Sequence, residues 1–412
     1  MGSSKRIYAN EYTNSGIPFY RSKEVIQKAR NESITEYLYI SEDKFDELDS
    51  KFGSPKYGDI LLASIGANLG VSYFVNTNQK FYFKDGNVTW FRNFSNELNS
   101  NFLYYWLNSV EGQHLLLNSA IGSAQKALTI DGLKKISLKV PAVEEQKAIA
   151  DTLSCLDDMI KLNDRTNQIL EEMAQAVFKQ WFEDFEFPDE DGQPYKSSGG
   201  EMVDSELGQL PKGWRVFELS EIFEINPIRK ITRGTIAPYL EMANMPTQGP
   251  APRIWANREF ESGMKFINGD TLVARITPCL ENGKTAYVDF LEEDQVGWGS
   301  TEYIVLRPKP PITTVLAYIL ARSDRFRDYA IKRMIGSSGR QRVPADNIAL
   351  YQIAMPPLNH TIHENFGIIV ESMFCHMKSV AQESRVLSQS RDTLLPKLMS
   401  GEIRVPYEEE VI

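Results

Sequence analysis

The chain carries the same series of motifs twice, and this duplication restricts its architecture more than any other feature. The first copy contains GSAQK at residues 122–126, DGLKKI at 131–136 and a heptad run beyond Pro141. The second copy contains GSSGRQR at 336–342, then Asp346, Asn347 and Ile348 at the place of DGLKKI, and another heptad run. A duplicated module with one long helix per copy predicts one task performed at two places. It favours bipartite recognition over a single catalytic pocket.

Length and composition are those of an ordinary soluble protein. The 412 residues, 42% of them hydrophobic and 24% charged, allow two or three domains with separate cores. We find no apolar run of about 18 residues and no signal sequence at the start, so we expect no membrane association and a cytoplasmic location. The three cysteines, Cys155, Cys279 and Cys375, are too scattered for a disulfide framework.

The net charge of −10 is unevenly distributed. Residues 1–140 carry +2 and residues 211–354 carry +3, whereas residues 141–210 carry −12 and residues 355–412 carry −3. The net negative charge therefore belongs to the helical segments and the linker, and the two modules are mildly basic. This distribution does not exclude nucleic acid as a ligand.

Two heptad seams predict a pair of coiled-coil helices. From Ile149 to Trp181, apolar or small residues recur at steps of four and three, and adding 217 to each position gives a second run. Each helix would be about 40 residues long, or roughly 60 Å. In an antiparallel pair with aligned ends, Asn163 lies near Ser384, where a buried polar pair would set the register; the alternative is that Asn163 is a solvated seam position. The predicted seam contains Ile149, Leu153, Leu156, Ile160, Asn163, Leu170, Val177, Phe366, Val370, Met373, Met377, Leu387 and Leu394.

The remaining sequence predicts two α+β modules. Short β-rich runs, for example at 57–66 and 269–276, precede helical stretches in both copies, and a strand is expected to end at Pro141. The predicted fold class is α+β, with two tandem globular modules containing curved β-sheets, separated by two long antiparallel coiled-coil helices. The expected segments are 1–141 for the first module, 142–184 for the first helix, 185–209 for a linker, 210–356 for the second module, 357–400 for the second helix and 401–412 for a C-terminal tail.

No sequence pattern for catalysis or metal binding is complete. The GKT run at 283–285 has Pro278 where a phosphate-binding loop needs glycine. The tripeptide at 226–228 lacks the second proline and the aromatic residue that an amino-methyltransferase would need. The histidines and cysteine between 360 and 376 match no common zinc module. We therefore assign no catalytic residue and no metal ligand.

The densest basic run indicates binding chemistry. It lies between Arg322 and Arg342 and ends in the Gly/Ser loop at 336–339. Backbone amides of such a loop can approach a phosphate, and Arg and Gln side chains can reach base edges. The alternative is a solvated helix that carries ion pairs one turn apart. The candidate nucleic-acid-binding residues of the two copies are Ser123, Gln125, Lys126, Lys134, Arg275, Arg333, Ser337, Arg340, Gln341 and Arg342.

Several segments resemble the specificity subunit of type I restriction-modification enzymes. They are PAVEEQKAIA at 141–150, LDDMIKLN at 156–163, EEMAQAVFKQWFEDF at 171–185, ELGQLPKGW at 206–214 and LLPKLMSGEI at 394–403. The resemblance covers nearly the whole chain. It implies two target recognition domains, each reading one half of a split double-stranded DNA sequence, with the helix pair acting as a ruler.

The resemblance also implies partners. Two modification subunits would hold S-adenosylmethionine, and restriction subunits would use ATP and Mg²⁺, while this chain binds no cofactor and catalyses nothing. The helices would form the docking surface, with Met173, Phe178, Trp181 and Phe182 as candidates. The first module has no counterpart of the LPKGW opening at 210–214, so we expect it to lack its initial strand. Either the tail at 404–412 or another chain would complete it.

A rival interpretation comes from a different class of protein. The chain could be a coiled-coil scaffold that binds protein partners through its α+β modules. The salt dependence of binding to duplex DNA separates the two interpretations, because phosphate neutralisation by basic side chains gives a steep dependence.

Overall fold

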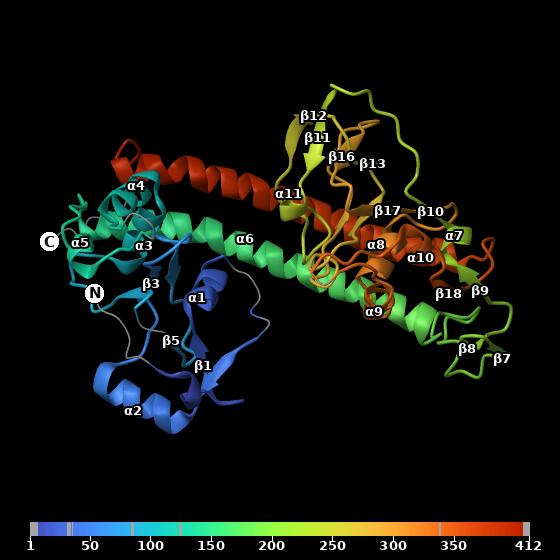
Figure 1. Cartoon of the computed structure of the whole chain (residues 1–412), viewed down its shortest axis with the longest axis horizontal. Helices are drawn as coiled ribbons and strands as arrows, with labels where there is room; N and C mark the ends of the chain where they lie inside the picture. The colour runs from blue at the N-terminus through green and yellow to red at the C-terminus, as the bar shows by residue number, and fades with distance from the viewer. Residues whose placement is uncertain are drawn as a thin grey trace. The chain divides into compact units, whose positions relative to one another are not determined.

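The computed structural model describes residues 7–30, 34, 36–83, 86–122, 126–337 and 339–406 (Figure 1). The chain divides into two compact units, unit 1 with residues 1–158 and 387–412, and unit 2 with residues 159–386. Two long helices, α6 (Val143–Phe178) and α11 (Ile362–Ser400), cross this division, so each unit contains part of both.

Unit 1 is built around a three-stranded antiparallel sheet. Its central strand β3 (Ile60–Ala63) pairs with β4 (Ser72–Phe74) and β6 (Val88–Phe91). Both β3 and β6 are buried along their whole length, as expected for continuous apolar runs. A second sheet has the order β2-β1-β5. The remaining elements are a 3-10 turn (Ala9–Glu11), β1 (Ile17–Tyr20), α1 (Ser22–Ala29), β2 (Leu38–Ile40), α2 (Glu42–Phe52), β5 (Tyr82–Phe83), α3 (Ser100–Asn108), α4 (Val110–Ser119) and α5 (Ile130–Leu133).

Unit 2 contains the equivalent sheet with one more strand. β17 (Tyr303–Pro308) and β14 (Thr271–Ala274) form its centre, in the order β10-β17-β14-β15. A second sheet has the order β12-β11-β16-β13, and β18 pairs with β9. The remaining elements are β7 (Met202–Ser205), β8 (Gly208–Pro211), β9 (Arg215–Glu218), α7 (Leu219–Ile222), β10 (Phe223–Ile225), β11 (Ile236–Leu240), η3 (Met242–Asn244), β12 (Ala256–Glu259), β13 (Met264–Phe266), β15 (Thr285–Tyr287), β16 (Gly297–Gly299), α8 (Val315–Arg322), α9 (Asp324–Lys332), α10 (Ala345–Ala349) and β18 (Gln352–Met355).

The duplication extends to individual hydrogen bonds. Asp59 and Asp270 stand before the central strands, and each accepts the backbone N–H three residues upstream at 2.9 Å. Ser109 and Ser323 each separate two short helices and cap the second one, accepting the backbone N–H three residues downstream at 3.1 and 3.3 Å. The two units are therefore copies of one α+β module. The predicted fold class is confirmed.

In unit 1 the first half of α6 packs against the last half of α11. Ile149 and Leu153 share a buried cluster with Leu398. An Arg391 nitrogen lies 2.7 Å from an Asp157 carboxylate oxygen. Residue numbers rise along one helix as they fall along the other, so the helices are antiparallel here.

In unit 2 the two helices are also antiparallel and keep the register expected from the sequence. The Asn163 amide donates to the Glu383 carboxylate at 3.1 Å, one residue from the predicted neighbour Ser384. Further along, the rings of Trp181 and Phe366 have centroids 5.8 Å apart. Asn163 is half-buried and hydrogen-bonded across the pair, so it is more than a solvated seam position.

Most of the predicted seam residues face a core, but to different extents. Ile149, Leu153, Phe366, Val370 and Met377 are buried. The others are half-buried: Leu156, Ile160, Leu170, Val177, Met373, Leu387 and Leu394.

Residues 137–140 depart from the prediction. They were expected to form a strand like β18 of unit 2, but they form none. β18 is a strand because it pairs with β9, and among the described residues of unit 1 no segment supplies the equivalent edge. The sequence pattern alone cannot create a strand without its partner.

The predicted linker at 185–209 is more ordered than its composition indicates. β7 within it pairs with β8 as a hairpin. Phe187 stacks on Tyr195 and on Trp214, with centroids 4.7 and 5.0 Å apart. A few aromatic contacts therefore anchor a segment that is otherwise rich in Gly, Ser and acidic residues.

Candidate nucleic-acid interface

One loop recurs with the same closure in both units. In unit 2, Ile335 and Arg342 exchange two backbone hydrogen bonds, both of 2.9 Å. In unit 1, Ile121 and Ala127 exchange the equivalent bonds, of 2.9 and 2.8 Å. Each pair closes the turn that contains the Gly/Ser motif, so the repeated motif forms a repeated structure.

Each closed loop is also bound to the end of the central strand. In unit 2, Val343 N donates to Arg275 O at 2.9 Å and Thr277 N donates to Gln341 O at 3.0 Å. These bonds place the backbone of residues 341–343 beside residues 275–277, which directly follow β14. The equivalent bonds of unit 1 are Leu128 N to Ser64 O at 2.8 Å and Gly66 N to Lys126 O at 3.3 Å.

The loop of unit 2 presents polar and basic groups to solvent. Ser337 and Arg340 are exposed, and Gln341 is half-buried. Gly336 and Gly339 have φ values of +121° and +79°, which L side chains rarely adopt, so glycine is required for this path. The loop can bring backbone amides close to an anion while Arg340 remains available.

Arg342 is held by a carboxylate of its own module. Its Nε and a terminal nitrogen bind Glu302 at 2.8 and 2.7 Å, a two-pronged arrangement that raises the pKa of the guanidinium. Next to this pair, Arg275 has a buried Nε without a hydrogen-bond partner among the described residues. Among the described residues one buried donor of Arg275 thus lacks a partner, whereas Arg342 is paired with Glu302.

Arg333 lies at the base of the same loop. It is exposed, and its guanidinium carbon lies 3.5 Å from the centroid of the Tyr329 ring. Stacking on the ring leaves the planar edge of a guanidinium free to donate hydrogen bonds. Arg275, Arg333 and Arg340 therefore belong to one edge of unit 2.

The predicted residues of unit 1 are only partly described. Lys126 is exposed at the end of its loop, and Lys134 is exposed directly after α5. Ser123 and Gln125 lie outside the described residues. Lys126 follows the loop and Lys134 follows α5, so the two lysines belong to successive elements of unit 1.

The described residues show no cluster typical of a metal-dependent enzyme. Nowhere in them do three His, Cys, Asp or Glu side chains meet in a way that could hold a metal ion. No described helix is both long enough and apolar enough to cross a membrane.

Comparison with known proteins identifies the repeated module. The family model of the type I restriction modification DNA specificity domain matches the chain twice, over residues 2–172 and 211–369. The chain belongs to this family. Its two copies of the specificity domain correspond to the duplication found in the sequence.

Individual relatives agree with the family model. The chain is 28% identical to the MjaIX specificity subunit of Methanocaldococcus jannaschii over 98% of its own length and 90% of that protein. It is 32% identical to the HindI specificity subunit of Haemophilus influenzae over 42% of this chain and 39% of that protein. The crystal structure of a type I S subunit from M. genitalium has the same fold, with a TM-score of 0.53, 17% identity and coverage of 99% of this chain and 94% of that one.

The predicted docking residues of this specificity-domain protein are mostly core residues. Phe178, Trp181 and Phe182 are only 2%, 6% and 3% exposed. A turn of π-helix at Lys179–Glu183 ends the helix there and the rings pack against the core that includes Trp214. Met173, at 47% exposed, is the one of the four that remains accessible. A docking role for the three aromatic residues conflicts with their burial.

The structure reveals an exposed apolar stripe on α6, of which the sequence analysis named only Met173. Its members are exposed and follow steps of three, seven and four residues along the helix. They are Met159 (40% exposed), Leu162 (65%), Ile169 (42%) and Met173 (47%). Each of the four directly precedes a seam residue, at 160, 163, 170 and 174. A search for a second apolar heptad in the sequence could therefore have identified them.

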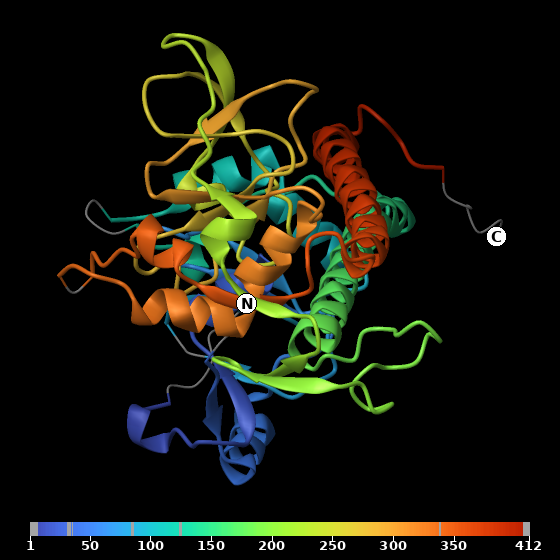
Figure 2. The ribbon, with the colours of Figure 1, turned by 90° about the vertical axis from the view of Figure 1, so that its right-hand side faces the viewer.

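A β-ribbon in unit 2 was also missed. β11 and β12 pair antiparallel, and both views show them extending away from the β14–β17 sheet (Figures 1 and 2). Every residue of β12 is exposed, and Arg258 stacks on Tyr239 with its guanidinium carbon 4.5 Å from the ring centroid. The segment before the ribbon contains exposed Lys230 and Arg233. The strands β11 (IAPYL) and β12 (ANRE) are too short to show a clear alternation in sequence.

Proposed function

We propose that this chain is the DNA-recognition subunit of a type I restriction-modification complex, with each module reading one half of a bipartite double-stranded DNA target. The observation that supports this most directly is the recurrence of one Gly-containing loop, closed by the same backbone bonds and anchored to the same strand end, in two modules of a specificity-domain protein.

Within unit 2, two features suit DNA contact. The loop supplies Arg340 and Gln341, and Arg275 lies at the end of β14 to which the loop is bound. The β11–β12 ribbon supplies Arg258, and the segment before it supplies Lys230 and Arg233. A two-stranded ribbon fits the major groove, and Arg and Gln distinguish base edges there. We assign the exposed lysines Lys126 and Lys134 to the equivalent half-site contact of unit 1, together with Ser123 and Gln125.

The helices α6 and α11 would set the spacing between the half-sites. Both helices pass through both units, and the antiparallel register is the same in each. A coiled-coil pair is stiff along its axis, so its length would determine how many base pairs separate the two recognised sequences.

The complex would contain further subunits. Two modification subunits would dock on the helices and hold S-adenosylmethionine, and restriction subunits would use ATP and Mg²⁺. This chain would bind no cofactor and catalyse no step. We place the docking contact on the exposed stripe of Met159, Leu162, Ile169 and Met173, because exposed apolar patches of this kind mark protein interfaces.

Fluorescence anisotropy with duplex DNA across a salt series tests the proposed function. We expect the logarithm of the binding constant to fall linearly and steeply with the logarithm of the salt concentration. Replacing Arg340 by Ala should lower the affinity and reduce the slope by about one unit. The exposed Arg325 on α9 is the matched control, and Arg325→Ala should change neither. Binding that is insensitive to salt, or no binding, would instead favour the scaffold interpretation.

A further inference from the structure

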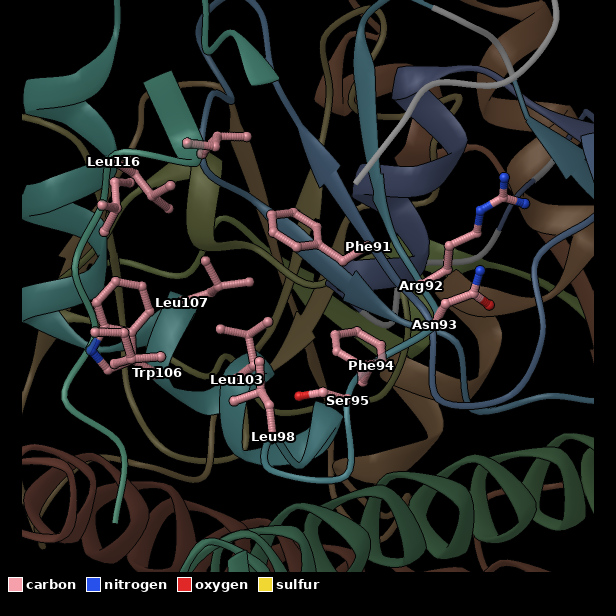
Figure 3. A pocket seen from close by; sticks show the side chains of 13 residues that line it. Phe91, Arg92, Asn93, Phe94, Ser95, Leu98, Leu103, Trp106, Leu107 and Leu116 are labelled. Atoms are coloured by element: carbon pink, nitrogen blue, oxygen red, sulfur yellow. The ribbon is translucent and has the colours of Figure 1, made fainter. Parts of the chain in front are cut away.

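Unit 1 contains an apolar cavity that no predicted site explains. Its volume is about 330 Å³. Leu103, Leu107 and Trp106 of α3 meet Phe91 of β6 around it, while the Arg92 side chain points away (Figure 3). On the remaining side, Leu133, Ile136 and Leu138 complete the lining.

In unit 2 the equivalent place is filled by a segment of the chain itself. The helical turn α7 lies between two flanking strands, where Leu219 N donates to Tyr351 O and Lys309 N donates to Ile222 O, both at 2.8 Å. Phe217 and Phe223, on either side of α7, are 2% and 1% exposed in the main core. The segment β9–α7–β10 thus supplies four buried apolar side chains: Phe217, Leu219, Ile222 and Phe223.

The strand registers establish that these places correspond. In unit 1, the first residue of the central strand pairs with Phe91, and in unit 2 the first residue of the central strand pairs with Leu306. Phe91 lines the cavity, and Leu306 belongs to the core that contains Phe217 and Phe223. Leu133, on α5 after the first loop, corresponds to Ile348 on α10 after the second, and Ile348 belongs to that core too.

Two open backbone edges border the cavity. β6 pairs with β3 on one side, and among the described residues no strand pairs with its other side. In unit 2 the equivalent strand β17 pairs with β10 on that side. Residues 137–140 pair with no strand in the part of unit 1 that the structure describes, whereas β18 pairs with β9. Ile136 and Leu138 are half-buried against the cavity, and Ser137 and Lys139 face solvent, which is the alternation of a strand.

We propose that this cavity is a docking site for a strand–turn–strand segment of a partner polypeptide with the apolar pattern of β9–α7–β10. Its strands would pair with β6 and with residues 137–140, and its apolar side chains would fill the cavity. Unpaired strand edges attract an added strand, and main-chain hydrogen bonds then provide affinity while side-chain pockets provide specificity. A small apolar molecule would leave both edges unpaired. The proposal does not depend on DNA recognition.

A peptide with the sequence of residues 210–226 provides the probe. Titrated into the full chain, a fluorescently labelled copy should bind saturably, with a dissociation constant below about 100 μM. The same peptide with Phe217→Asp and Ile222→Asp should bind at least tenfold more weakly, because it carries charge into an apolar cavity. This comparison leaves the folded chain unchanged, so a folding defect cannot produce the difference. DNA affinity is measured separately and should not change.

Amide hydrogen exchange locates the bound peptide. We expect new protection at residues 88–94 and 136–140 and no change in β17 or β18. A Leu138→Lys chain, altered at the half-buried rim of the cavity, should lose the protection. Three results would overturn the proposal: no binding, equal binding of the two peptides, or protection restricted to β17 and β18, which would mean that the peptide exchanges with the segment of unit 2.

Discussion

Glu171 joins α6 to the α+β module of unit 2 through three hydrogen bonds. Its buried carboxylate accepts hydrogen bonds from Tyr318 at 2.6 Å, from Arg322 at 3.0 Å and from the Gly249 amide at 3.0 Å. We expect Glu171→Ala to destabilise the chain by about 3–5 kcal/mol, because it leaves the Arg322 charge buried and unpaired. Tyr318→Phe should cost about 1–2 kcal/mol.

Urea unfolding measures both changes in the free energy of unfolding, and the neighbouring exposed Glu172 is the control. Glu172→Ala should shift this free energy by less than about 0.5 kcal/mol. Equal effects at positions 171 and 172 would show that the buried network does not hold the module.

His363, at the start of α11, gives stability a dependence on pH. Its side chain is buried, with a ring nitrogen 3.3 Å from Pro356 O, and burial lowers its pKa from the usual 6.5. Below pH 6.5 the unfolded chain therefore binds more protons than the folded chain at this position, and stability decreases as the pH falls. The slope from one such group is at most about 1.4 kcal/mol per pH unit.

Unfolding experiments between pH 7.5 and pH 5.5 test this expectation. Subtracting the free energy of unfolding of a His363→Gln chain from that of the native chain removes the contribution of the carboxylates, and this difference should decrease as the pH falls below 6.5. The exposed His376 is the control, since His376→Gln should leave the pH dependence as it is. A difference that does not vary with pH would contradict the assignment.

At the scale of elements, the exposed stripe of α6 should bind a partner subunit. Leu162→Glu and Ile169→Glu place charge in that stripe without touching the core, so we expect normal folding and DNA affinity but at least tenfold weaker assembly with the modification subunit. Gln168→Glu, also exposed and on the same helix, should assemble normally. Size-exclusion chromatography of mixed subunits distinguishes the variants. Unimpaired assembly of Leu162→Glu and Ile169→Glu would show that the modification subunit does not dock on this stripe.

Elements whose own sequence has a clear periodicity were predictable from the sequence. Elements that form only by pairing or packing with a distant segment of the chain were not. The seam from Ile149 to Trp181 determines which face of α6 is buried, so its antiparallel register followed from counting residues. Residues 137–140 have strand-like alternation but no edge to pair with. Phe178 and Phe182 lie where a helix face meets a module, and only tertiary packing shows that they point inward.

Of the candidate site, the loops were predictable from the sequence and the contacts between distant residues were not. The Gly/Ser loops are short motifs between recognisable elements, so their recurrence identified them. The pairing of Arg342 with Glu302 joins residues 40 positions apart and therefore has no local signal. The β11–β12 ribbon has two short strands, the apolar IAPYL and the polar ANRE, whose pairing becomes evident in the folded module.

At the scale of the whole molecule, the length of the helix pair should set the DNA spacer. Inserting one heptad before Asn163 and a matched heptad after Ser384 keeps the seam in phase, because the apolar pattern repeats every seven residues. Each helix then lengthens by about 10 Å, or roughly three base pairs at 3.4 Å per step.

Genome-wide methylation mapping, in cells that also carry the partner subunits, should then show both half-sites unchanged but separated by roughly three more base pairs. The control insertion of the same seven residues after Glu190, an exposed position outside the helices, should leave the spacing as it was. Both half-sites should be retained because the loops and the β11–β12 ribbon that we propose to contact bases lie within the modules and are not altered. An unchanged spacer in the doubly extended chain would mean that the distance between the half-sites is set by something other than α6 and α11.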